Sequence, residues 1–300
     1  MTTPQHFTSL ANAVCSLFGE GTKIETTSRI SGGDINEAYG LTLTGGKCVF
    51  MKTNTRENLS FFTAEAAGLC AIARTKAIGT PQILGVGTDG DRGGRSFLLL
   101  EFIHGKSRGI NDWEDFARRL SDMHKASTAG LVSNGKYGLG CDNYIGRRRQ
   151  VNRGHDSWTG FFRDCRLEPQ FQDAAPYFDG EDLKRIVRLL DHLDEMLVEP
   201  DYPSLLHGDL WGGNVIAGND GSAWLIDPAV YVGHAEADLA MTELFGGFPP
   251  AFYDAYKEAA PLRPGYERRR DIYNLYHLLN HLNMFGRMYL SEVKRIVRRM

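Results

Sequence analysis

The sequence predicts an α+β protein of two lobes: an N-terminal lobe built on a five-stranded antiparallel sheet, and a mainly helical C-terminal lobe. Two observations lead to this prediction. Five short apolar and β-branched stretches, separated by glycine-containing turns, lie between residues 23 and 103. From Trp113 onward, most stretches have helical periodicity. Because 300 residues exceed the usual size of one domain, we expect lobes at 1–103 and 104–300.

Composition excludes several other classes of protein. The chain is 42% hydrophobic and 24% charged, which allows a sizeable core and argues against disorder. A net charge of −3 predicts neither a nucleic-acid nor an anionic membrane surface. The apolar run 97–100 is too short to cross a bilayer, and the N-terminus has no leader pattern. With five scattered cysteines and no CxxC, we expect a cytoplasmic protein with reduced thiols and no nucleic-acid or membrane partner.

The expected N-terminal elements follow the chain in order. Helices are predicted at 4–18 and 61–73, and strands at 23–30, 38–43, 47–52, 82–87 and 96–103. The first turn contains Gly32 and Gly33, which would let the backbone approach phosphates and offer N–H groups. Taken alone, this turn is more simply explained as a plain hairpin.

Lys52 ends the third predicted strand, and Glu65 follows thirteen residues later in a helical stretch. A strand lysine paired with a helix glutamate orients the lysine on nucleotide phosphates in kinases. The alternative is a surface lysine and a solvated glutamate, the usual fate of both residue types. The order along the chain favours the paired interpretation, because the next motif completes a phosphoryl-transfer site.

That motif is HGDLWGGN at 207–214, followed by Asp227 after the apolar run 224–226. Phosphoryl transfer needs a carboxylate that orients the attacking hydroxyl, and oxygen ligands that hold magnesium on the nucleotide phosphates. Asp209 is the expected catalytic carboxylate, and Asn214 and Asp227 are the expected Mg²⁺ ligands. Each residue alone is weak evidence, but the spacing from Asp to Asn matches the catalytic loop of protein kinases. The predicted cofactors are therefore ATP and Mg²⁺.

The remaining elements place the other parts of such a site. In the kinase arrangement, the backbone of Glu101, Phe102 and Ile103, at the end of the fifth strand, would contact adenine. The glycine-rich stretch 130–180 is expected to be mostly loop and to contribute to the acceptor site. Further helices are predicted at 113–125, 182–197, 236–245, 251–259, 266–285 and 291–299.

The order and spacing of these motifs resemble the protein-kinase-like superfamily, on the branch of aminoglycoside phosphotransferases and choline kinases. A closer resemblance, which covers nearly the whole chain, is to the fructosamine kinase (ketosamine kinase) family. Its WGGN and NHxNxFG patterns are specific, whereas HGD with a later Asp is shared across the superfamily. The resemblance rests on residues 207–214, 227–229, 233–241 and 276–286, with support from 62–69, 158–167 and Gln170.

This resemblance implies a bilobal protein-kinase-like fold with nucleotide in the N-terminal lobe and catalysis in the C-terminal lobe. It also implies phosphorylation of a ketosamine at its third-carbon hydroxyl, on a small molecule or a glycated protein side chain, leading to deglycation. Two alternatives stay open: a kinase for another small hydroxyl, such as an aminoglycoside or choline, and a pseudokinase without chemistry. The intact set of site residues argues against the pseudokinase.

Several further residues belong to the predicted acceptor site. Trp211 would either cover the acceptor or pack beneath its loop. His277, Asn280 and His281 would line the acceptor pocket; alternatively, the two histidines, four apart on one helix, would form a zinc pair that lacks a third ligand.

The catalytic loop and two departures from the family pattern complete the prediction. His207 and Asp238 are expected to support the catalytic loop structurally. Where family loops often read Gly-Ser-Thr-Pro-Gln, this chain has Arg147, Arg148 and Arg149 after Gly146. They would either edge the pocket and favour substrates with a carboxylate or phosphate, or only solubilise a loop. Asp34 stands where some members carry a redox-active cysteine, so no redox switch is expected there.

Overall fold

The computed structural model describes residues 4–31, 35–90, 93–105 and 110–300. The chain forms two compact units. Unit 1 comprises Met1–Arg108 and Ile216–Asp227, and unit 2 comprises Gly109–Val215 and Pro228–Met300. Within the described ranges, no helix is both long and apolar enough to cross a membrane.

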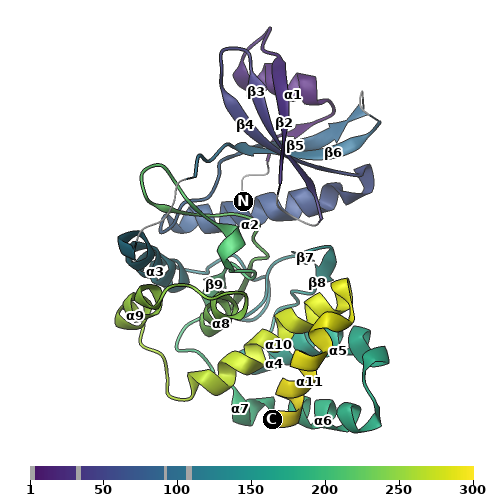
Figure 1. The fold of residues 1–300 in the computed structure, drawn as a ribbon, viewed down its shortest axis with the longest axis vertical. Coiled ribbons are helices and arrows are strands. Elements are labelled where there is room, and N and C mark those ends of the chain that lie inside the picture. Colours follow the sequence, from purple (N-terminus) through teal and green to yellow (C-terminus); the bar gives the residue numbers. More distant parts are fainter. Residues whose placement is uncertain (1–3, 32–34, 91–92, 106–109) are drawn as a thin grey trace. The chain divides into compact units, whose positions relative to one another are not determined.

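Unit 1 is built on one mixed sheet (Figure 1). The five predicted strands are present, and each pairs antiparallel with its neighbours. A further strand, β1, lies at one edge and pairs parallel with β5, so the strand order in the described residues is β1-β5-β6-β4-β3-β2. The bounds are β1 His6–Phe7, β2 Ile24–Ile30, β3 Glu37–Leu43, β4 Cys48–Asn54, β5 Ile83–Asp89 and β6 Arg95–Glu101.

The extra strand corrects the predicted sheet of five antiparallel strands and the helix predicted at 4–18. The helix, α1 (Leu10–Phe18), begins only after β1. Gly87 of β5 makes the pairing possible, because a Cβ there would lie 2.1 Å from the carbonyl oxygen of Phe7. The Phe7 ring in turn enters the core of unit 1. A two-residue strand carries no periodicity that sequence alone can detect.

The continuous apolar run in β6 is buried on both faces of the sheet. Side chains alternate between faces along a strand. Leu98 and Leu100 pack with the helix α2 (Leu59–Thr75), the long helix of unit 1 in Figure 1. Phe97 and Leu99 pack on the opposite face, in the cluster that holds α1.

Residues Ile216–Asp227 belong to unit 1, although the sequence order alone places them in the C-terminal lobe. They form the small hairpin β10 (Val215–Ala217) and β11 (Ala223–Leu225). The backbone N–H of Leu225 donates to the carbonyl of Gly79 at 2.8 Å. Gly79 also leaves room for the ring of Trp224, which a Cβ would approach to 3.0 Å. Unit 1 therefore carries Asp227.

Unit 2 is mainly helical, and α10 lies at its centre, packed against α5, α8 and α11 (Figure 1). Two small hairpin-like pairs accompany the helices: β7 (Asn143–Ile145) with β8 (Arg148–Gln150), and β9 (Ser204–Leu206) with β12 (Tyr231–Gly233). The helices are α3 Ile110–Lys125, α4 Trp158–Phe162, the π-helical turn η3 Arg163–Leu167, α5 Glu168–Ala174, α6 Gly180–Asp191, α7 Leu193–Met196, α8 Glu236–Leu244, α9 Pro250–Ala259, α10 Tyr266–Phe285 and α11 Leu290–Arg299.

Two predictions about unit 2 were wrong in detail. The stretch 130–180 is not mostly loop, because its second half forms α4, η3 and α5. Trp158, Phe161 and Phe162 are buried there in the core of the unit. The helix predicted at 182–197 is interrupted at His192, which separates α6 from α7. By contrast, α10 has the predicted bounds.

Candidate active site

In unit 1, Lys52 lies between two carboxylates. Its ammonium contacts Glu65 Oε1 at 2.7 Å and also donates to Asp227 Oδ1. The predicted pairing of Lys52 with Glu65 is therefore present. Lys52 lies directly opposite Leu98 on the neighbouring strand, so its side chain points to the sheet face that α2 covers. Glu65 projects from that helix.

Burial sets the electrostatics of this cluster, because Lys52 is only 6% exposed. Burial alone would lower the pKa of Lys52, but Asp227 and Glu65 together raise it above its ordinary value. Burial raises the pKa of Glu65 to about 7 against the opposing attraction of Lys52. Because one ammonium group is shared by two carboxylates, the negative charge of Glu65 is only partly neutralised. Lys52 stays charged throughout the physiological pH range.

The backbone of Asp227 adopts an unusual conformation. Its φ of +57° is in the left-handed region, where only one other non-glycine residue of the described chain is found. Such conformations are unfavourable and occur where the surrounding structure enforces them, often at functional sites. At Asp227 the turn follows β11, and the carboxylate reaches Lys52.

The predicted nucleotide loop and hinge are described only in part. Gly32, Gly33 and Asp34 lie outside the described residues. The Glu101 carboxylate accepts a hydrogen bond from the backbone N–H of Gln82 at 3.1 Å. The Phe102 ring lies against Gly40, and the backbone of Ile103 has no hydrogen-bond partner in the described part of the chain. The backbone of Ile103 therefore remains available to a ligand, whereas the N–H of Glu101 donates to the Gln82 carbonyl at 2.9 Å.

In unit 2, Asp238 holds the start of the catalytic loop. Its buried carboxylate accepts hydrogen bonds from the backbone N–H groups of His207, at 2.7 Å, and Gly208, at 2.9 Å. His207 Nδ1 accepts the backbone N–H of Asp209 at 3.3 Å. Burial alone would raise the pKa of Asp238, but hydrogen bonds and nearby histidines hold it below its ordinary value. These hydrogen bonds connect Asp238 and His207 to the backbone of the HGD motif.

The glycine of the HGD motif has a steric reason. Gly208 has a φ of +81°, and a Cβ there would lie 2.1 Å from the carbonyl oxygen of Ala229. The backbone N–H of Ala229 donates to the His207 carbonyl at 2.8 Å. Any larger residue at 208 would therefore push the HGD motif away from the segment before β12 that contains Ala229.

Asn214 orients the candidate catalytic carboxylate. It closes a short 3₁₀ turn, η5 (Gly212–Asn214), and its amide nitrogen donates to the Asp209 carbonyl at 2.8 Å and to Asp209 Oδ2 at 3.2 Å. The amide oxygen of Asn214 has no hydrogen-bond donor among the residues that the structure describes. A free amide oxygen suits a hard cation such as Mg²⁺.

The predicted acceptor residues differ in accessibility. Trp211 is 41% exposed, and its ring lies against Gly213 of the same loop. Asn280 is buried and accepts a hydrogen bond from Gln170 at 3.4 Å. Burial lowers the pKa of His277 to about 3, so its ring is neutral.

His281 is only partly buried, and its Nδ1 lies 2.8 Å from the His277 carbonyl. That bond uses one nitrogen of the proposed zinc pair. No group of three His, Cys, Asp or Glu side chains in the described ranges is arranged to hold a metal ion.

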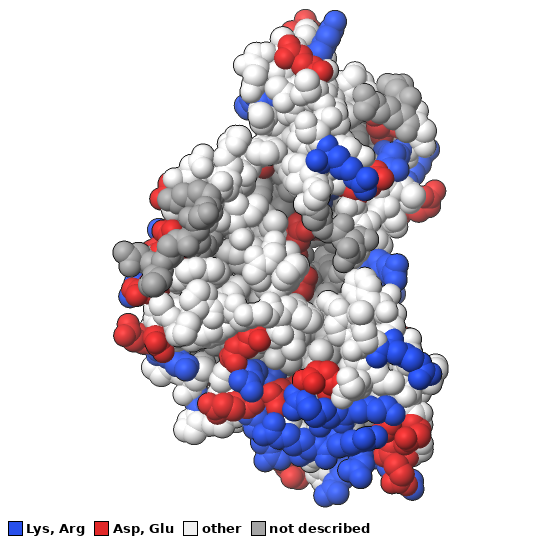
Figure 2. Space-filling view, in the orientation of Figure 1, with Lys and Arg blue, Asp and Glu red and all other residues white. Residues whose placement is uncertain are grey.

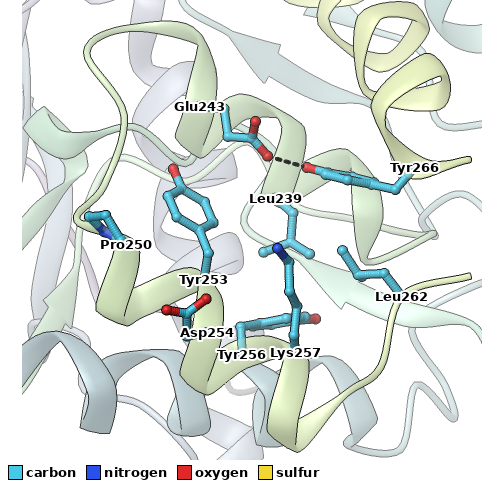
Figure 3. Close-up of a pocket in the computed structure, with 9 residues that line it drawn as sticks. All are labelled: Leu239, Glu243, Pro250, Tyr253, Asp254, Tyr256, Lys257, Leu262 and Tyr266. Atoms are coloured by element: carbon cyan, nitrogen blue, oxygen red, sulfur yellow. Dashed lines mark hydrogen bonds between the residues drawn. The ribbon is translucent and has the colours of Figure 1, made fainter. Parts of the chain in front are cut away.

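Sequence reasoning missed two residues behind the catalytic loop. His124 Nε2 lies 3.2 Å from Asp238 Oδ2, and His124 Nδ1 lies 2.7 Å from the Tyr256 hydroxyl. Tyr256 lines a cavity of about 290 Å³ together with Tyr253 and Tyr266 (Figure 3). The sequence does show His124 in the last turn of an amphipathic helix, which could have marked it as a candidate. The neighbouring residues give no indication that its partner is Asp238.

A third missed residue is Arg166, which lies in the π-helical turn η3 and is fully buried. Its guanidinium lies 3.9 Å from the centre of the Tyr231 ring and donates to the Val151 carbonyl and to Asn152. It forms no ion pair with any described residue. Its charge is held by aromatic faces and neutral acceptors, as in cation–π sites.

These features define a class of enzyme. A buried strand lysine paired with a helix glutamate and an aspartate, and a loop that orients a second aspartate through an asparagine, are the elements of kinase chemistry. The fold agrees: the crystal structure of an aminoglycoside phosphotransferase with AMP-PNP and hygromycin B matches with a TM-score of 0.64 over 97% of this chain and 98% of that one. At 15% identity, this match shows the protein-kinase-like fold alone.

Closer relatives identify the family. The family model described as fructosamine kinase matches residues 6–300, and the chain belongs to this family of ATP-dependent kinases. It is 35% identical to a probable ketoamine kinase of Synechocystis, over 98% of this chain and 97% of that protein. It is 40% identical to a chloroplastic protein-ribulosamine 3-kinase of Oryza sativa, over 93% and 80%. A fructosamine-3-kinase homologue from Haemophilus somnus matches with a TM-score of 0.84 and 31% identity, over 97% and 96%.

Proposed function

We propose that this protein transfers the γ-phosphate of ATP to the 3-hydroxyl of a ketosamine of the ribulosamine or fructosamine type. The amine is either a small molecule or a glycated protein side chain. The names of the Oryza and Synechocystis relatives support the substrate class. The observation that carries the chemistry is the orientation of Asp209 by Asn214, on a loop that Asp238 holds through two backbone hydrogen bonds.

The residues of the chain have separate tasks in this proposal. Asp209 orients the sugar hydroxyl and accepts its proton. Lys52, held by Glu65, aligns the nucleotide phosphates. Asn214 and Asp227 would hold Mg²⁺, since both offer hard oxygen donors. When bound, the magnesium–nucleotide supplies the phosphoryl group and offsets its negative charge.

The remaining predicted residues complete the two binding sites. We assign the adenine to the backbone of residues 101–103, supported by the unpaired backbone of Ile103. Gly32 and Gly33 would cover the phosphates. We assign the sugar to Trp211, supported by its exposure, and to the helix face of His277 and His281. Asn280 is a supporting residue in this proposal, because its side chain is buried against Gln170.

Phosphorylation at the third carbon gives the reaction a chemical purpose. That carbon neighbours the ketone carbon, so loss of a proton from the first carbon allows the phosphate to leave from the third. The bond electrons depart with the phosphate, and water then hydrolyses the resulting imine and frees the amine. We therefore propose that the enzyme acts in deglycation.

A substrate screen tests the proposal directly. ATP consumption with ribulosyl-lysine and fructosyl-lysine should exceed that with kanamycin or choline by at least about 100-fold, since a site built to hydrogen-bond one substrate rejects ligands that leave its polar groups unpaired. Faster turnover of kanamycin or choline would replace the ketosamine assignment with the corresponding kinase. Nucleotide binding without turnover of any acceptor would favour the pseudokinase.

A further inference from the structure

Two exposed apolar side chains lie at the C-terminal end of helix α10 and in the turn that follows it. Phe285, its last residue, is 43% exposed, and Met288, in the 3₁₀ turn η6 (Arg287–Tyr289), is 73% exposed. Few large hydrophobic side chains of the described chain are this exposed. Exposed apolar side chains that cluster on one surface commonly mark an interaction site.

Aromatic contacts connect this surface to the proposed acceptor site. The His281 ring lies 5.5 Å from the Phe285 ring and 5.0 Å from the Tyr289 ring, measured between centroids. The Phe245 ring centroid lies 4.8 Å from that of His281. A substrate that reaches His281 therefore has a continuous aromatic surface leading outward to Phe285.

The three unusual arginines differ in their partners. Arg148 pairs with Asp173, and Arg149 pairs with Asp142 at 2.6 Å. Arg147, which is exposed, donates instead to the carbonyl of Met284 in α10 at 2.8 Å. A carbonyl satisfies one N–H of the guanidinium but does not neutralise its charge. Only Arg147 of the three thus adds an uncompensated charge beside α10.

Arg287 adds a second uncompensated charge to the same surface. It is exposed, and its guanidinium lies 5.8 Å from the centre of the Tyr177 ring. Neither Arg147 nor Arg287 forms an ion pair with any residue that the structure describes. We define the carrier surface as Arg147, Phe285, Arg287 and Met288.

The larger concentration of positive charge on unit 2 is different in kind. Figure 2 shows Lys and Arg side chains gathered at the lower end of the molecule, where α6 and α11 lie in Figure 1. On α11 these cations have carboxylate partners: Lys294 and Arg298 bind Asp182, Arg295 binds Glu292, and Arg299 binds Asp271. Because these cations already form ion pairs within the protein, they have less charge available for binding another molecule.

We propose that the carrier surface binds the polypeptide around a glycated lysine and selects segments in which acidic and apolar side chains flank that lysine. The proposal rests on the proposed function, because it treats His281 as part of the acceptor site. Arginine without a carboxylate partner binds carboxylates through paired hydrogen bonds. Phe285 and Met288 offer apolar contact area between these charges. A free ketosamine lacks flanking acidic and apolar side chains, so the carrier surface would act on protein substrates and not on small ones.

The test compares three substrates: free ribulosyl-lysine, and two short peptides that each carry one ribulosylated lysine. One peptide has Glu and Leu beside that lysine, and the other has Lys and Leu. For the wild-type enzyme, kcat/KM should favour the acidic peptide by roughly five- to ten-fold at low salt, mainly through KM. The preference should shrink at high salt, because exposed charges are screened.

Variants locate the effect on the carrier surface. Arg147→Gln combined with Arg287→Gln should remove the preference for the acidic peptide. Met288→Ser should raise KM for both peptides alike, by about two- to three-fold. The matched control is Arg149→Gln, two residues from Arg147 in the same hairpin, which should leave the preference unchanged because Arg149 is already paired with Asp142.

Two results would overturn this inference: equal kcat/KM for the two peptides in the wild-type enzyme, or an equal loss of preference in Arg149→Gln. Failure to phosphorylate free ribulosyl-lysine would instead count against the proposed function. In that case, fluorescence anisotropy of the labelled acidic peptide still tests the surface. A Kd that the Arg147 and Arg287 substitutions do not raise would then reject it.

Discussion

The candidate catalytic carboxylate is oriented by residues that are themselves held in place. Asp209 receives a hydrogen bond from Asn214, and its own N–H is bound by His207, whose backbone Asp238 holds. Each of these bonds starts from a buried or half-buried group, so little freedom remains at the reacting oxygen. Such preorganisation is how a phosphoryl-transfer site lowers its barrier.

Replacing Asp209 by Asn tests its role with the smallest change of shape. The amide oxygen can still accept the bond from Asn214, but it cannot accept a proton. We expect kcat to fall by at least about 100-fold, while the Kd for magnesium AMP-PNP stays within about three-fold of wild type. Steady-state kinetics and calorimetry measure the two quantities. Turnover within a few-fold of wild type would remove Asp209 from the catalytic role.

A buried histidine makes stability depend on pH. Burial lowers the pKa of His234 to about 3, and Arg269 adds to this effect. Because the pKa in the unfolded chain is about 6.5, the unfolded state binds the proton first as the pH falls. The folded state therefore loses about 2 kcal/mol of stability between pH 7 and pH 5 from this one residue.

We expect His234→Asn to lose about 2 kcal/mol less than wild type over the same range, since Asn does not titrate. Its side-chain oxygen can still accept the Glu236 N–H that His234 Nδ1 binds at 3.2 Å. Urea denaturation at pH 7, 6 and 5 measures the free energy of unfolding. Parallel pH dependence in the two proteins would show that the pKa of His234 is the same in the folded and unfolded states.

At the scale of elements, three helices support the catalytic loop from behind. Helix α8 carries Asp238, α3 carries His124 and α9 carries Tyr256, and a chain of hydrogen bonds joins them. Packing between α3 and α9 brings the last two together. The cavity in Figure 3 provides a test, because Tyr256 and Tyr266 both line it. Only Tyr256 takes part in the hydrogen bonds that lead through His124 to Asp238.

Tyr256→Phe should lower the free energy of unfolding by about 1 kcal/mol. It should also lower kcat by at least about three-fold, because His124, the partner of Asp238, is no longer positioned by the Tyr256 hydroxyl. The matched control is Tyr266→Phe, which removes a hydrogen bond of 2.7 Å to Glu243 in the same cavity. The control should lose about 1–2 kcal/mol of stability with kcat unchanged. Thermal unfolding and steady-state kinetics separate the two effects. Equal changes of kcat in both variants would mean that general loosening of the helices, not the hydrogen-bond chain, is responsible.

At the scale of the whole molecule, each of the two units carries part of the residues that the proposed reaction uses. Unit 1 carries the phosphate-aligning Lys52 and Asp227, and unit 2 carries Asp209 and Asn214. The chain passes from unit 2 to unit 1 after Val215, one residue beyond Asn214, and returns to unit 2 after Asp227.

Magnesium AMP-PNP should stabilise the protein by about 2.7 kcal/mol at one hundred times its Kd. In Asp227→Asn, the part of this stabilisation that depends on magnesium should disappear, because the amide is a weaker ligand than the carboxylate. Asn tolerates the left-handed backbone at 227, so the variant does not add strain. Thermal unfolding with nucleotide, with and without magnesium, checks this. An unchanged magnesium effect would place the metal on other residues.

Local pattern determined much of this protein before the structure was considered. The five antiparallel strands, the bounds of α10 and the pairing of Lys52 with Glu65 followed from periodicity and spacing. The HGD and WGGN motifs predict the catalytic loop, and the family that they resemble is the one to which the chain belongs. These features are readable because each depends on neighbours a few residues away, where alternation and helical spacing decide which side chains share a face.

Tertiary structure decided the rest. Only the fold shows that β1 joins β5, that Gly79 binds the hairpin carrying Asp227, and that Tyr256 supports Asp238 through His124. The same holds for Arg166 among its aromatic rings and for Arg147, alone of three arginines, without a carboxylate partner. Periodicity reports which residues are buried, but not which distant polar group satisfies them. That choice is made by packing, because most buried donors and acceptors form hydrogen bonds with whichever groups the fold brings beside them.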